Sequence, residues 1–469
     1  MDYTSQNRIN EDLLNVLIDE ATLKPPVLRE LLLTSYKGAK AAFYLEDEVL
    51  MDIHLEIPTE RSRLGEIYVG RIKSVADGIG AAFVEYDKDI VGFLPLSQIK
   101  PELILNRDMP QKITPEQELL VQVFKDPMKN KDATLTTDLM FSGKYLILTP
   151  RSPGIRFSRK LKKDEKRNLL NLVKKVIEDL FGDNELFLDH YGLIVRTNAL
   201  YSDYYDIFYE LHELFHNACE VIYKGKNRTA YSLLYRDAPF YRRVLRDQYD
   251  LSTIRVITDD KNIRDSILPK ESWEEGDGEL SAAISHLTNE ERIRFLTLAE
   301  SLKTKQEAIF ARQQGGLSIT LWEDENYGLL DRFGIKAAVE KAVSKRVWLK
   351  SGAFLVIEHT EALTVIDVNS GKASSKKKSP EEFNLRVNLD AAREIARQLR
   401  LRNLSGIVIV DFINLDEQES RERLVHTLKR ELQKDPVGAG LVDITALGLV
   451  EITRKKTSSP LGEKIKALV

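Results

Sequence analysis

Three side chains that suit a hard cation follow apolar runs in the C-terminal third: Asp367 and Asn369 in TVIDVNS, and Asp411 in IVIVDFIN. Asp367 and Asn369 are two residues apart, so on a strand both side chains point to the same face. Asp411 closes an apolar run that should form a buried strand, and open α/β sheets place ligand sites at such strand ends. Two carboxylates and an amide oxygen suit Mg²⁺, with waters and a substrate phosphate as further ligands. The spacing indicates a metal site fit for phosphodiester hydrolysis, because a metal lowers the pKa of a bound water.

The same residues also have an ordinary structural interpretation. Asp367 could cap a turn and Asp411 could cap the helix that follows it. Spacing alone does not separate the two interpretations. Two like charges 4 Å apart cost about 4 kcal/mol at an effective dielectric near 20, so a close pair of carboxylates favours a bound cation.

The elements around these residues predict an α/β layer. Strands are expected in AFLVIEHT, ALTVIDVNS, GIVIVDF and GLVEITR. A helix should open at Ser379, a capping residue followed by Pro380, and should stop near Asn403. A second helix is expected to enter at Asp416, with Glu419 at capping-box spacing. The acidic residues would then lie at strand ends.

The upstream chain predicts several further units. ELLLTS and AKAAFYLEDEVLMDIHLE alternate as antiparallel strands that break off near Arg63, and five short strands between Glu66 and Thr137 suggest a small closed barrel. A separate α/β unit and a charged helical insert follow. The predicted units are an N-terminal extension (1–30), a first sheet part (31–64), the barrel (65–137), an α/β unit (138–226), a second sheet part (227–342) with an insert near 279–314, and a C-terminal domain (343–469).

Composition limits the possible functions. The chain has 469 residues, enough for three or four compact units, and a formal net charge of -4, so any nucleic-acid site must be a local basic surface. Cys219 is the only cysteine, which excludes a disulfide framework or a thiolate zinc cluster within one chain. No apolar run approaches the roughly 18 residues that span a bilayer, and the N-terminus is too acidic for a signal peptide. We expect a cytoplasmic protein without a membrane span.

The run from Val347 to Asn414, together with LGLVEITRKK, closely resembles the catalytic DNase I-like subdomain of the ribonuclease E/G family. The resemblance implies an α/β multidomain fold: an RNase H-like domain interrupted by an S1-type OB barrel and a 5′-sensor domain, followed by a DNase I-like catalytic domain. The implied catalytic residues are Asp367 and Asp411, which match the metal-binding aspartates, and Asn369, which matches the asparagine that orients the first of them or the attacked phosphate. The implied activity is a Mg²⁺-dependent endoribonuclease, with Mn²⁺ as an alternative ion. It would cut single-stranded, AU-rich RNA in rRNA and tRNA maturation and mRNA decay, leaving 5′-phosphate and 3′-hydroxyl ends.

The resemblance also implies RNA-binding residues in the barrel. Phe83 and Phe93 match aromatics that stack on RNA bases, and Lys131 matches a basic contact. Stacking requires unpaired bases and contributes roughly 1–3 kcal/mol per base. From the sequence alone, both phenylalanines would more commonly belong to the barrel core.

A 5′-monophosphate pocket is implied as well, with Arg196 and Thr197 as phosphate contacts and Gly143 and Ile147 lining it. A guanidinium and a hydroxyl suit phosphate oxygens, although Arg196 alone would be interpreted as a solvated strand residue. The segment KDPVGAG lacks an arginine that the family supplies there. The chain also ends at Val469 without the family's CPxC zinc-link, so we expect a compact, ribonuclease G-like form, a homodimer without a zinc-tied tetramer.

Two rival functions stay open. A non-catalytic RNA-binding or ribosome-associated factor would use the barrel, and a DNA-directed nuclease would use the same metal chemistry. Carboxylates beside phosphates oppose binding, so an acidic pair has no use in a pure binder. The residues therefore favour the nuclease.

Overall fold

The computed structural model describes residues 27–58, 62–100, 103–107, 112–127, 131–248, 251–267, 319–324, 326–360, 362–371, 379–456 and 458–468. The predicted N-terminal extension, apart from its last four residues, and the predicted insert near 279–314 lie outside these ranges. Among the helices in these ranges, none combines the length and the apolar character required to cross a membrane.

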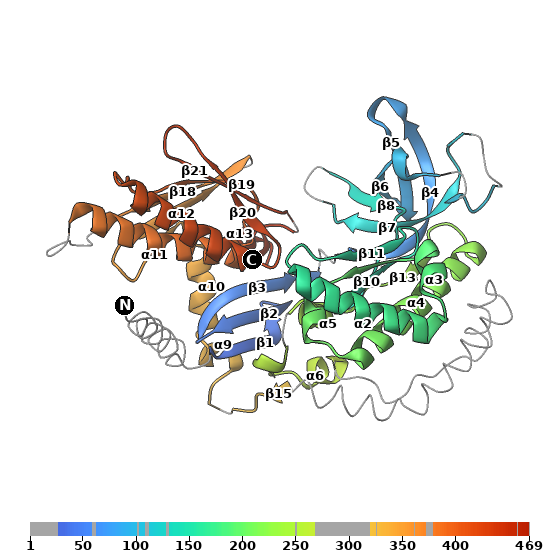
Figure 1. Cartoon of the computed structure of the whole chain (residues 1–469), viewed down its shortest axis with the longest axis horizontal. Helices are drawn as coiled ribbons and strands as arrows, with labels where there is room; N and C mark the ends of the chain where they lie inside the picture. Colours follow the sequence, from blue (N-terminus) through green and yellow to red (C-terminus); the bar gives the residue numbers. More distant parts are fainter. Residues whose placement is uncertain are drawn as a thin grey trace, which may run out of the picture.

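The first sheet is assembled from two distant parts of the chain (Figure 1). Strands β1 (Arg29–Tyr36), β2 (Ala39–Glu46) and β3 (Val49–Glu56) are antiparallel, and β14 (Ile254–Thr258) and β15 (Ile319–Leu321) continue the sheet beyond β1 in parallel. Helices α5 (Phe240–Asp247) and α6 (Lys261–Ile267) share one apolar cluster with this sheet, and α9 (Leu329–Arg332) and α10 (Ile335–Val343) share another. The chain leaves the sheet after β3 and returns to it at β14.

The segment between these two parts begins with a closed barrel. Its strands are β4 (Ile67–Ala76), β5 (Ala81–Asp87), β6 (Ile90–Pro95), β7 (Glu118–Lys125) and β8 (Ala133–Thr136). Strand β4 pairs with both β5 and β7, which closes the ring, as predicted from the five short strands. A short strand, β13 (Leu233–Tyr235), adds to the outside of β4. Two 3₁₀ turns, Asp77–Ile79 and Leu96–Gln98, connect barrel strands.

A second α/β unit follows the barrel. Its sheet has the order β11-β12-β10-β9, from β9 (Phe141–Ser142), β10 (Leu146–Thr149), β11 (Gly154–Phe157) and β12 (Gly192–Val195). Helices α2 (Lys163–Phe181), α3 (Asn184–His190) and α4 (Tyr204–Asn227) pack on it, with a 3₁₀ turn at Thr197–Tyr201. Another 3₁₀ turn, Leu251–Thr253, leads into β14 of the first sheet. Cys219 is buried in α4, and burial raises the pKa of its thiol to about 12. The thiol is therefore a core side chain.

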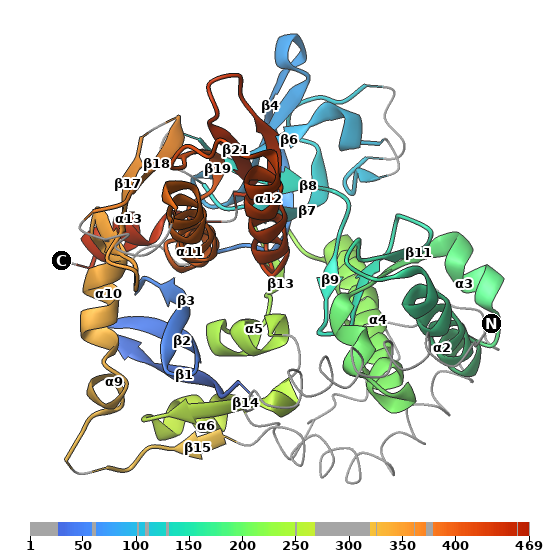
Figure 2. The same ribbon diagram turned by 60° about the vertical axis from the view of Figure 1, so that its left-hand side comes forward.

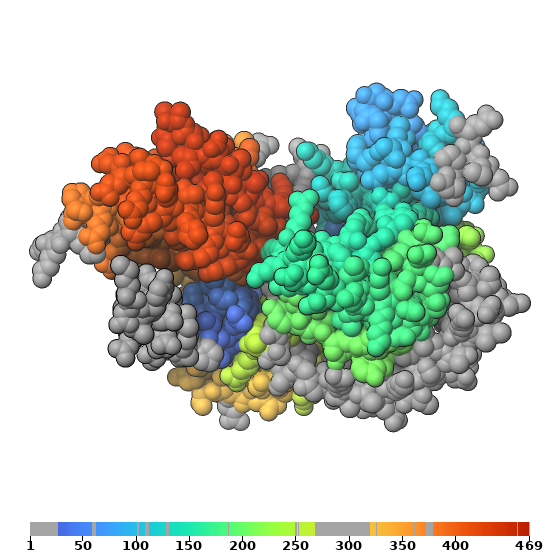
Figure 3. Space-filling view, viewed as in Figure 1, coloured from blue at the N-terminus to red at the C-terminus, as the bar shows by residue number. Residues whose placement is uncertain are grey.

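The C-terminal unit is a sheet with helices on one face. The strand order is β16-β17-β18-β19-β21-β20, from β16 (Arg346–Trp348), β17 (Phe354–His359), β18 (Leu363–Asn369), β19 (Gly406–Asp411), β20 (Ala439–Ile444) and β21 (Val450–Arg454). Figure 2 shows α11 (Pro380–Leu401) and α12 (Gln418–Gln433) side by side along this sheet. Helix α13 (Leu461–Lys466) ends the described chain and packs against the first sheet. Figure 3 shows this unit, in orange to red, and the barrel, in light blue to cyan, at opposite ends of one side of the molecule, with the surface receding between them.

One predicted helix start is wrong. Helix α12 begins at Gln418, and the residue before it, Glu417, makes no side-chain capping bond. The amides of Asp416 and Glu417 instead donate to the Glu381 carboxylate at 3.0 and 3.2 Å. A carboxylate from a neighbouring helix thus replaces the local capping box. The predicted start of α11 is confirmed, because Ser379 Oγ accepts the Glu382 amide and Pro380 occupies the first turn.

Candidate active site

Asp367 and Asp411 occupy equivalent positions on neighbouring parallel strands. The register between β18 and β19 pairs these two residues directly, and neighbouring strands lie about 4.8 Å apart. Both side chains are exposed, on the face of the sheet opposite α11 and α12. Asn369 Nδ2 donates to Asp367 Oδ2 at 2.7 Å. The structure therefore brings the three sequence-predicted residues together on one open face.

Alternation along the two strands explains this placement. Ile366 and Val368 flank Asp367 and lie 0% and 6% exposed among the core residues beneath α11 and α12. Val410 precedes Asp411 and is fully buried. Because side chains alternate across a strand, burying these apolar neighbours turns both carboxylates outward. The apolar pattern of the sequence thus orients the acidic pair.

The loop that leaves Asp411 is held by α11. Asn388, which is fully buried, donates through Nδ2 to the Ile413 carbonyl at 2.7 Å and accepts the Ile413 amide through Oδ1 at 3.1 Å. Further along the loop, the amides bound by Glu381 lower the pKa of that carboxyl, Asp416 contributing most. Helix α11 thereby sets the direction in which the chain leaves the acidic strand end.

The predicted aromatic pair of the barrel lies on its outer surface. Phe83 on β5 and Phe93 on β6 are register partners, with their ring centroids 6.3 Å apart in an edge-to-face arrangement. Both are only partly buried, whereas their neighbours Val84 and Leu94 are fully buried. The core interpretation of the two phenylalanines is therefore wrong. Lys131 is exposed and lies two residues before β8, which pairs with β6.

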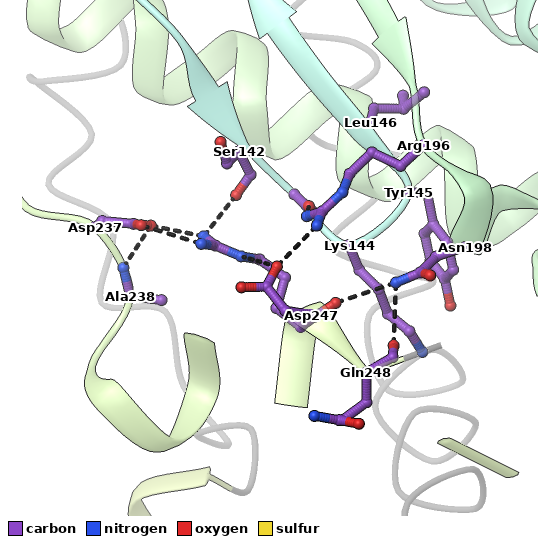
Figure 4. Close-up of polar contacts among 12 residues, drawn as sticks. Ser142, Lys144, Tyr145, Leu146, Arg196, Asn198, Asp237, Ala238, Asp247 and Gln248 are labelled. Atoms are coloured by element: carbon purple, nitrogen blue, oxygen red, sulfur yellow. Dashed lines mark hydrogen bonds and ion pairs between the residues drawn. The ribbon is translucent and has the colours of Figure 1, made fainter. Parts of the chain in front are cut away.

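One of the predicted 5′-phosphate residues, Arg196, lies beside the turn that contains Lys144 and Tyr145 in the second α/β unit (Figure 4). Arg196 Nη1 donates to the Gly143 carbonyl at 2.6 Å, and Nη2 pairs with Asp247 Oδ1 at 2.8 Å. Thr197 Oγ1 donates to Ser158 Oγ at 2.9 Å. The structure thus joins Arg196 to Gly143, and it gives the guanidinium an internal carboxylate partner that the sequence did not suggest.

A carboxylate from α4 shapes the same turn. Glu210 accepts the amides of Lys144, Tyr145 and Leu146 at 2.6–2.7 Å. Burial raises the pKa of Glu210 to about 7, although these three amides lower it. A Cβ at Gly143 would lie 2.3 Å from the Glu210 carboxyl carbon, so a side chain at this position would push the carboxylate away from the three amides. Ile147, the residue after Leu146 on β10, pairs with Ile194 on β12.

The family of the chain follows from matches over nearly all of it. The ribonuclease E/G family model matches residues 140–317 and 280–457, and the S1 RNA binding domain model matches residues 61–136, which span the closed barrel. The chain belongs to the ribonuclease E/G family. This confirms the family inferred from the sequence, and it confirms the S1-type barrel.

Relatives with known names align with most of the chain. Ribonuclease G of Escherichia coli strain K12 is 30% identical over 438 residues, which cover 91% of this chain and 80% of that protein. Ribonuclease E of Synechocystis is 31% identical over 434 residues, covering 91% of this chain and 57% of the relative. A ribonuclease E/G-like protein of Porphyra purpurea is 29% identical, covering 88% and 72% of the two chains.

The donor set at the acidic pair of this ribonuclease E/G chain fits a hard divalent cation. Within the described ranges, no group of three or more His, Cys, Asp or Glu side chains is placed to hold a metal ion. The acidic pair would supply two carboxylates, from Asp367 and Asp411, with Asn369 beside them. Mg²⁺ is commonly held by one or two carboxylates, with waters and substrate phosphates completing its octahedron. An exposed pair leaves room for those ligands.

Sequence reasoning missed two groups at these sites. Asn388 had a readable signal, because it is a polar residue on the apolar face of α11 between Leu385 and Ala391. Arg246, on α5, had no such signal in the sequence. In the structure it pairs with Asp237 at 2.7 Å and donates to the Ser142 carbonyl at 3.0 Å. Only the fold brings this second arginine to the turn that contains Gly143.

Proposed function

We propose that this endoribonuclease of the ribonuclease E/G family uses Asp367 and Asp411 to hold Mg²⁺, or Mn²⁺, at the phosphate it cleaves. The observation that carries the proposal is the pairing of the two exposed carboxylates across β18 and β19, with Asn369 bonded to the first. The 2.7 Å bond restrains the Asp367 carboxylate, and within the described part of the chain its other oxygen makes no hydrogen bond. When bound, the ion would supply charge neutralisation at the phosphate and acidify water.

Hydrolysis by water accounts for the ends that we expect. A bond forms between the water oxygen and phosphorus, the bond from phosphorus to the 3′-oxygen breaks, and that oxygen takes a proton. The products carry a 5′-phosphate and a 3′-hydroxyl. The open sheet face suits a single strand, because both carboxylates are exposed and no helix covers them within the described residues. We propose unpaired, AU-rich segments of rRNA and tRNA precursors and of mRNA as substrates.

The barrel would hold the same RNA away from the cleavage site. Phe83 and Phe93 expose ring surface on neighbouring strands, on which unpaired bases can stack, and Lys131 would contact a phosphate. In the family's terms, the first sheet with its helices is the RNase H-like domain, and the C-terminal unit is the DNase I-like domain.

The turn around Gly143 would bind the RNA 5′ end. Arg196 and Thr197 would be the phosphate contacts, with Gly143 and Ile147 lining the pocket. A 5′-monophosphate would have to replace Asp247 as the partner of Arg196. Sensing of the 5′ end would therefore be a competition between two anions for one guanidinium. A homodimer, expected from the sequence, stays a prediction.

The decisive experiment combines metal and side-chain removal. A short single-stranded AU-rich RNA is incubated with Mg²⁺, with Mn²⁺ or with EDTA, and the product ends are identified by mass spectrometry. Asp367→Asn and Asp411→Asn should each lower the cleavage rate by more than about 100-fold, because each removes a ligand charge. Asp390→Asn is the matched control, since Asp390 lies on α11 and pairs with Arg393.

Unchanged cleavage by the doubly substituted protein, or full cleavage in EDTA, would refute the metal site. Tight RNA binding by the unsubstituted chain without any Mg²⁺-dependent product would favour the non-catalytic factor. Equal cleavage of the matching deoxyribo-oligonucleotide would favour the DNA-directed nuclease.

A further inference from the structure

An exposed aromatic and arginine cluster lies beside the acidic pair. It consists of Arg346 and Trp348 on the edge strand β16 and Phe354 on β17. The Trp348 and Phe354 ring centroids are 5.1 Å apart, and the Arg346 guanidinium carbon lies 4.6 Å from the Phe354 centroid and 5.8 Å from that of Trp348. Trp348 is 62% exposed, which is a high value for the largest apolar side chain. We call these three residues the Trp348 cluster.

Strand register places the Trp348 cluster on the same face as the carboxylates. Phe354 pairs with Asn369 on β18 and with Trp348 on β16. Two residues further along β17, Val356 pairs with Arg346 on β16 and with Asp367 on β18. Each step between strands is about 4.8 Å, so Trp348 lies roughly 10 Å from Asn369, a distance that the nucleotides next to a bound phosphate can reach.

The rest of the structure holds Phe354 in place and leaves Trp348 open. A Cβ at Gly371 would lie 3.3 Å from the Phe354 ring, so the chain that leaves Asn369 packs directly against that ring. Phe354 thereby links the acidic strand to the edge strand. Trp348 stands on the outer side of Phe354 and has most of its surface free.

The charge of the Trp348 cluster favours an RNA strand as its occupant. Within the described residues, Arg346 stacks on the two rings and makes no ion pair with a carboxylate, whereas the neighbouring Lys345 pairs with Glu358. An arginine held over aromatic rings keeps its donors available for a phosphate. Exposed aromatics beside a cationic group are the elements with which proteins bind single strands, because every base offers a stacking face.

We propose that Trp348 stacks on the base of a nucleotide flanking the scissile phosphate, and that Arg346 contacts the phosphate of the same nucleotide. This rests on the proposed function, because it takes the acidic pair as the place of cleavage. The Trp348 cluster then sets the path of the RNA across the sheet face, from the carboxylates toward β16. It contributes base-independent affinity close to the reaction, in addition to the stacking on the barrel.

Binding measured without cleavage tests this proposal. The probe is a fluorescent, short AU-rich RNA, and the background is the Asp367→Asn/Asp411→Asn protein, in which the RNA stays intact. Trp348→Ala should weaken binding roughly 5- to 100-fold, and Trp348→Phe should retain most of the affinity. Tyr327→Ala is the matched control, because Tyr327 is also 62% exposed and lies outside the C-terminal sheet. Arg346→Gln should reduce the slope of log affinity against log salt by about one.

An abasic nucleotide, moved along the probe, identifies the stacked base. At one position next to the cleavage site the abasic penalty should disappear in Trp348→Ala, because both changes remove the same contact. The proposal is overturned if Trp348→Ala binds like Tyr327→Ala, or if the penalties add at every position. Failure of the proposed function is distinguishable, because it would show as metal-independent or absent cleavage by the unsubstituted protein while this binding pattern persists.

Discussion

Replacing Asn388 by alanine should destabilise the loop that follows Asp411. The amide side chain makes two bonds to Ile413, of 2.7 and 3.1 Å, from a fully buried position. Alanine leaves one backbone N–H and one C=O of Ile413 without a partner, and each buried unsatisfied group costs about 1–3 kcal/mol. We expect the free energy of unfolding to fall by about 2–4 kcal/mol. The cleavage rate should fall as well, because the loop no longer fixes the end of the strand that carries Asp411.

Asn384→Ala provides a control on the same helix and the same loop. Asn384 lies one turn earlier and makes a single 3.3 Å bond to the Asn414 carbonyl at the surface, so its loss should cost less than about 0.5 kcal/mol. Urea unfolding measures both variants, and hydrogen exchange of a peptide covering 409–417 reports on the loop itself. Equal stability and equal exchange in the two variants would refute the idea that Asn388 holds this loop.

Three further predictions concern RNA binding, 5′-end sensing and pH. Phe83→Ala should weaken binding of unpaired RNA roughly 5- to 100-fold in fluorescence anisotropy and leave the free energy of unfolding almost unchanged. Leu94→Ala, in the barrel core, should lower the free energy of unfolding by about 2–5 kcal/mol. A large loss of stability without a loss of RNA binding in Phe83→Ala would show that Phe83 is a core residue. Asp247→Asn should raise the preference for 5′-monophosphate over 5′-hydroxyl RNA roughly 2- to 5-fold, since an exposed ion pair is worth at most about 1 kcal/mol; an unchanged ratio of cleavage rates would exclude Arg196 as a sensor. Burial raises the pKa of Glu210 from 4.5 to about 7, so the folded chain holds this proton more tightly than the unfolded chain does. As the pH rises from 4.5 to 7, the free energy of unfolding should therefore decrease by at most about 1.4 kcal/mol per pH unit. Urea unfolding across this range should show Glu210→Gln without that decrease, and an identical pH profile would contradict the shift.

Much of the fold could be predicted because local patterns agree with it. The apolar runs around Asp367 and Asp411 predict strands, with Asp367 and Asn369 on one face, and Ser379 followed by Pro380 predicts the start of α11, as the structure shows. Five short strands with turn residues between them predict the barrel. In each case the information lies within about ten residues, where side-chain alternation and capping act directly on the backbone.

The second helix shows where local rules fail. Asp416 and Glu419 have capping-box spacing, yet the loop amides bond to Glu381, which is 35 residues away from Asp416. A local capping residue competes for the free amides of a helix start with any other carboxylate that the fold brings close. The residues next to the helix in the sequence do not include that competing carboxylate. The second arginine, Arg246, could not be predicted for the same reason: its partners belong to other elements of the fold.

The sequence by itself predicted Asp367, Asn369 and Asp411 as a site, and it determined the strands that carry them and the presence of an S1-type barrel, because periodicity and family motifs are properties of contiguous residues. Only the tertiary structure decided that Asp367 and Asp411 are register partners and that Asp247 forms an ion pair with Arg196. It also decided that Phe83 and Phe93 lie outside the barrel core. Pairing of strands and burial of rings depend on which distant segments pack together. Charges and hydrogen bonds then form between groups that only this packing brings within reach.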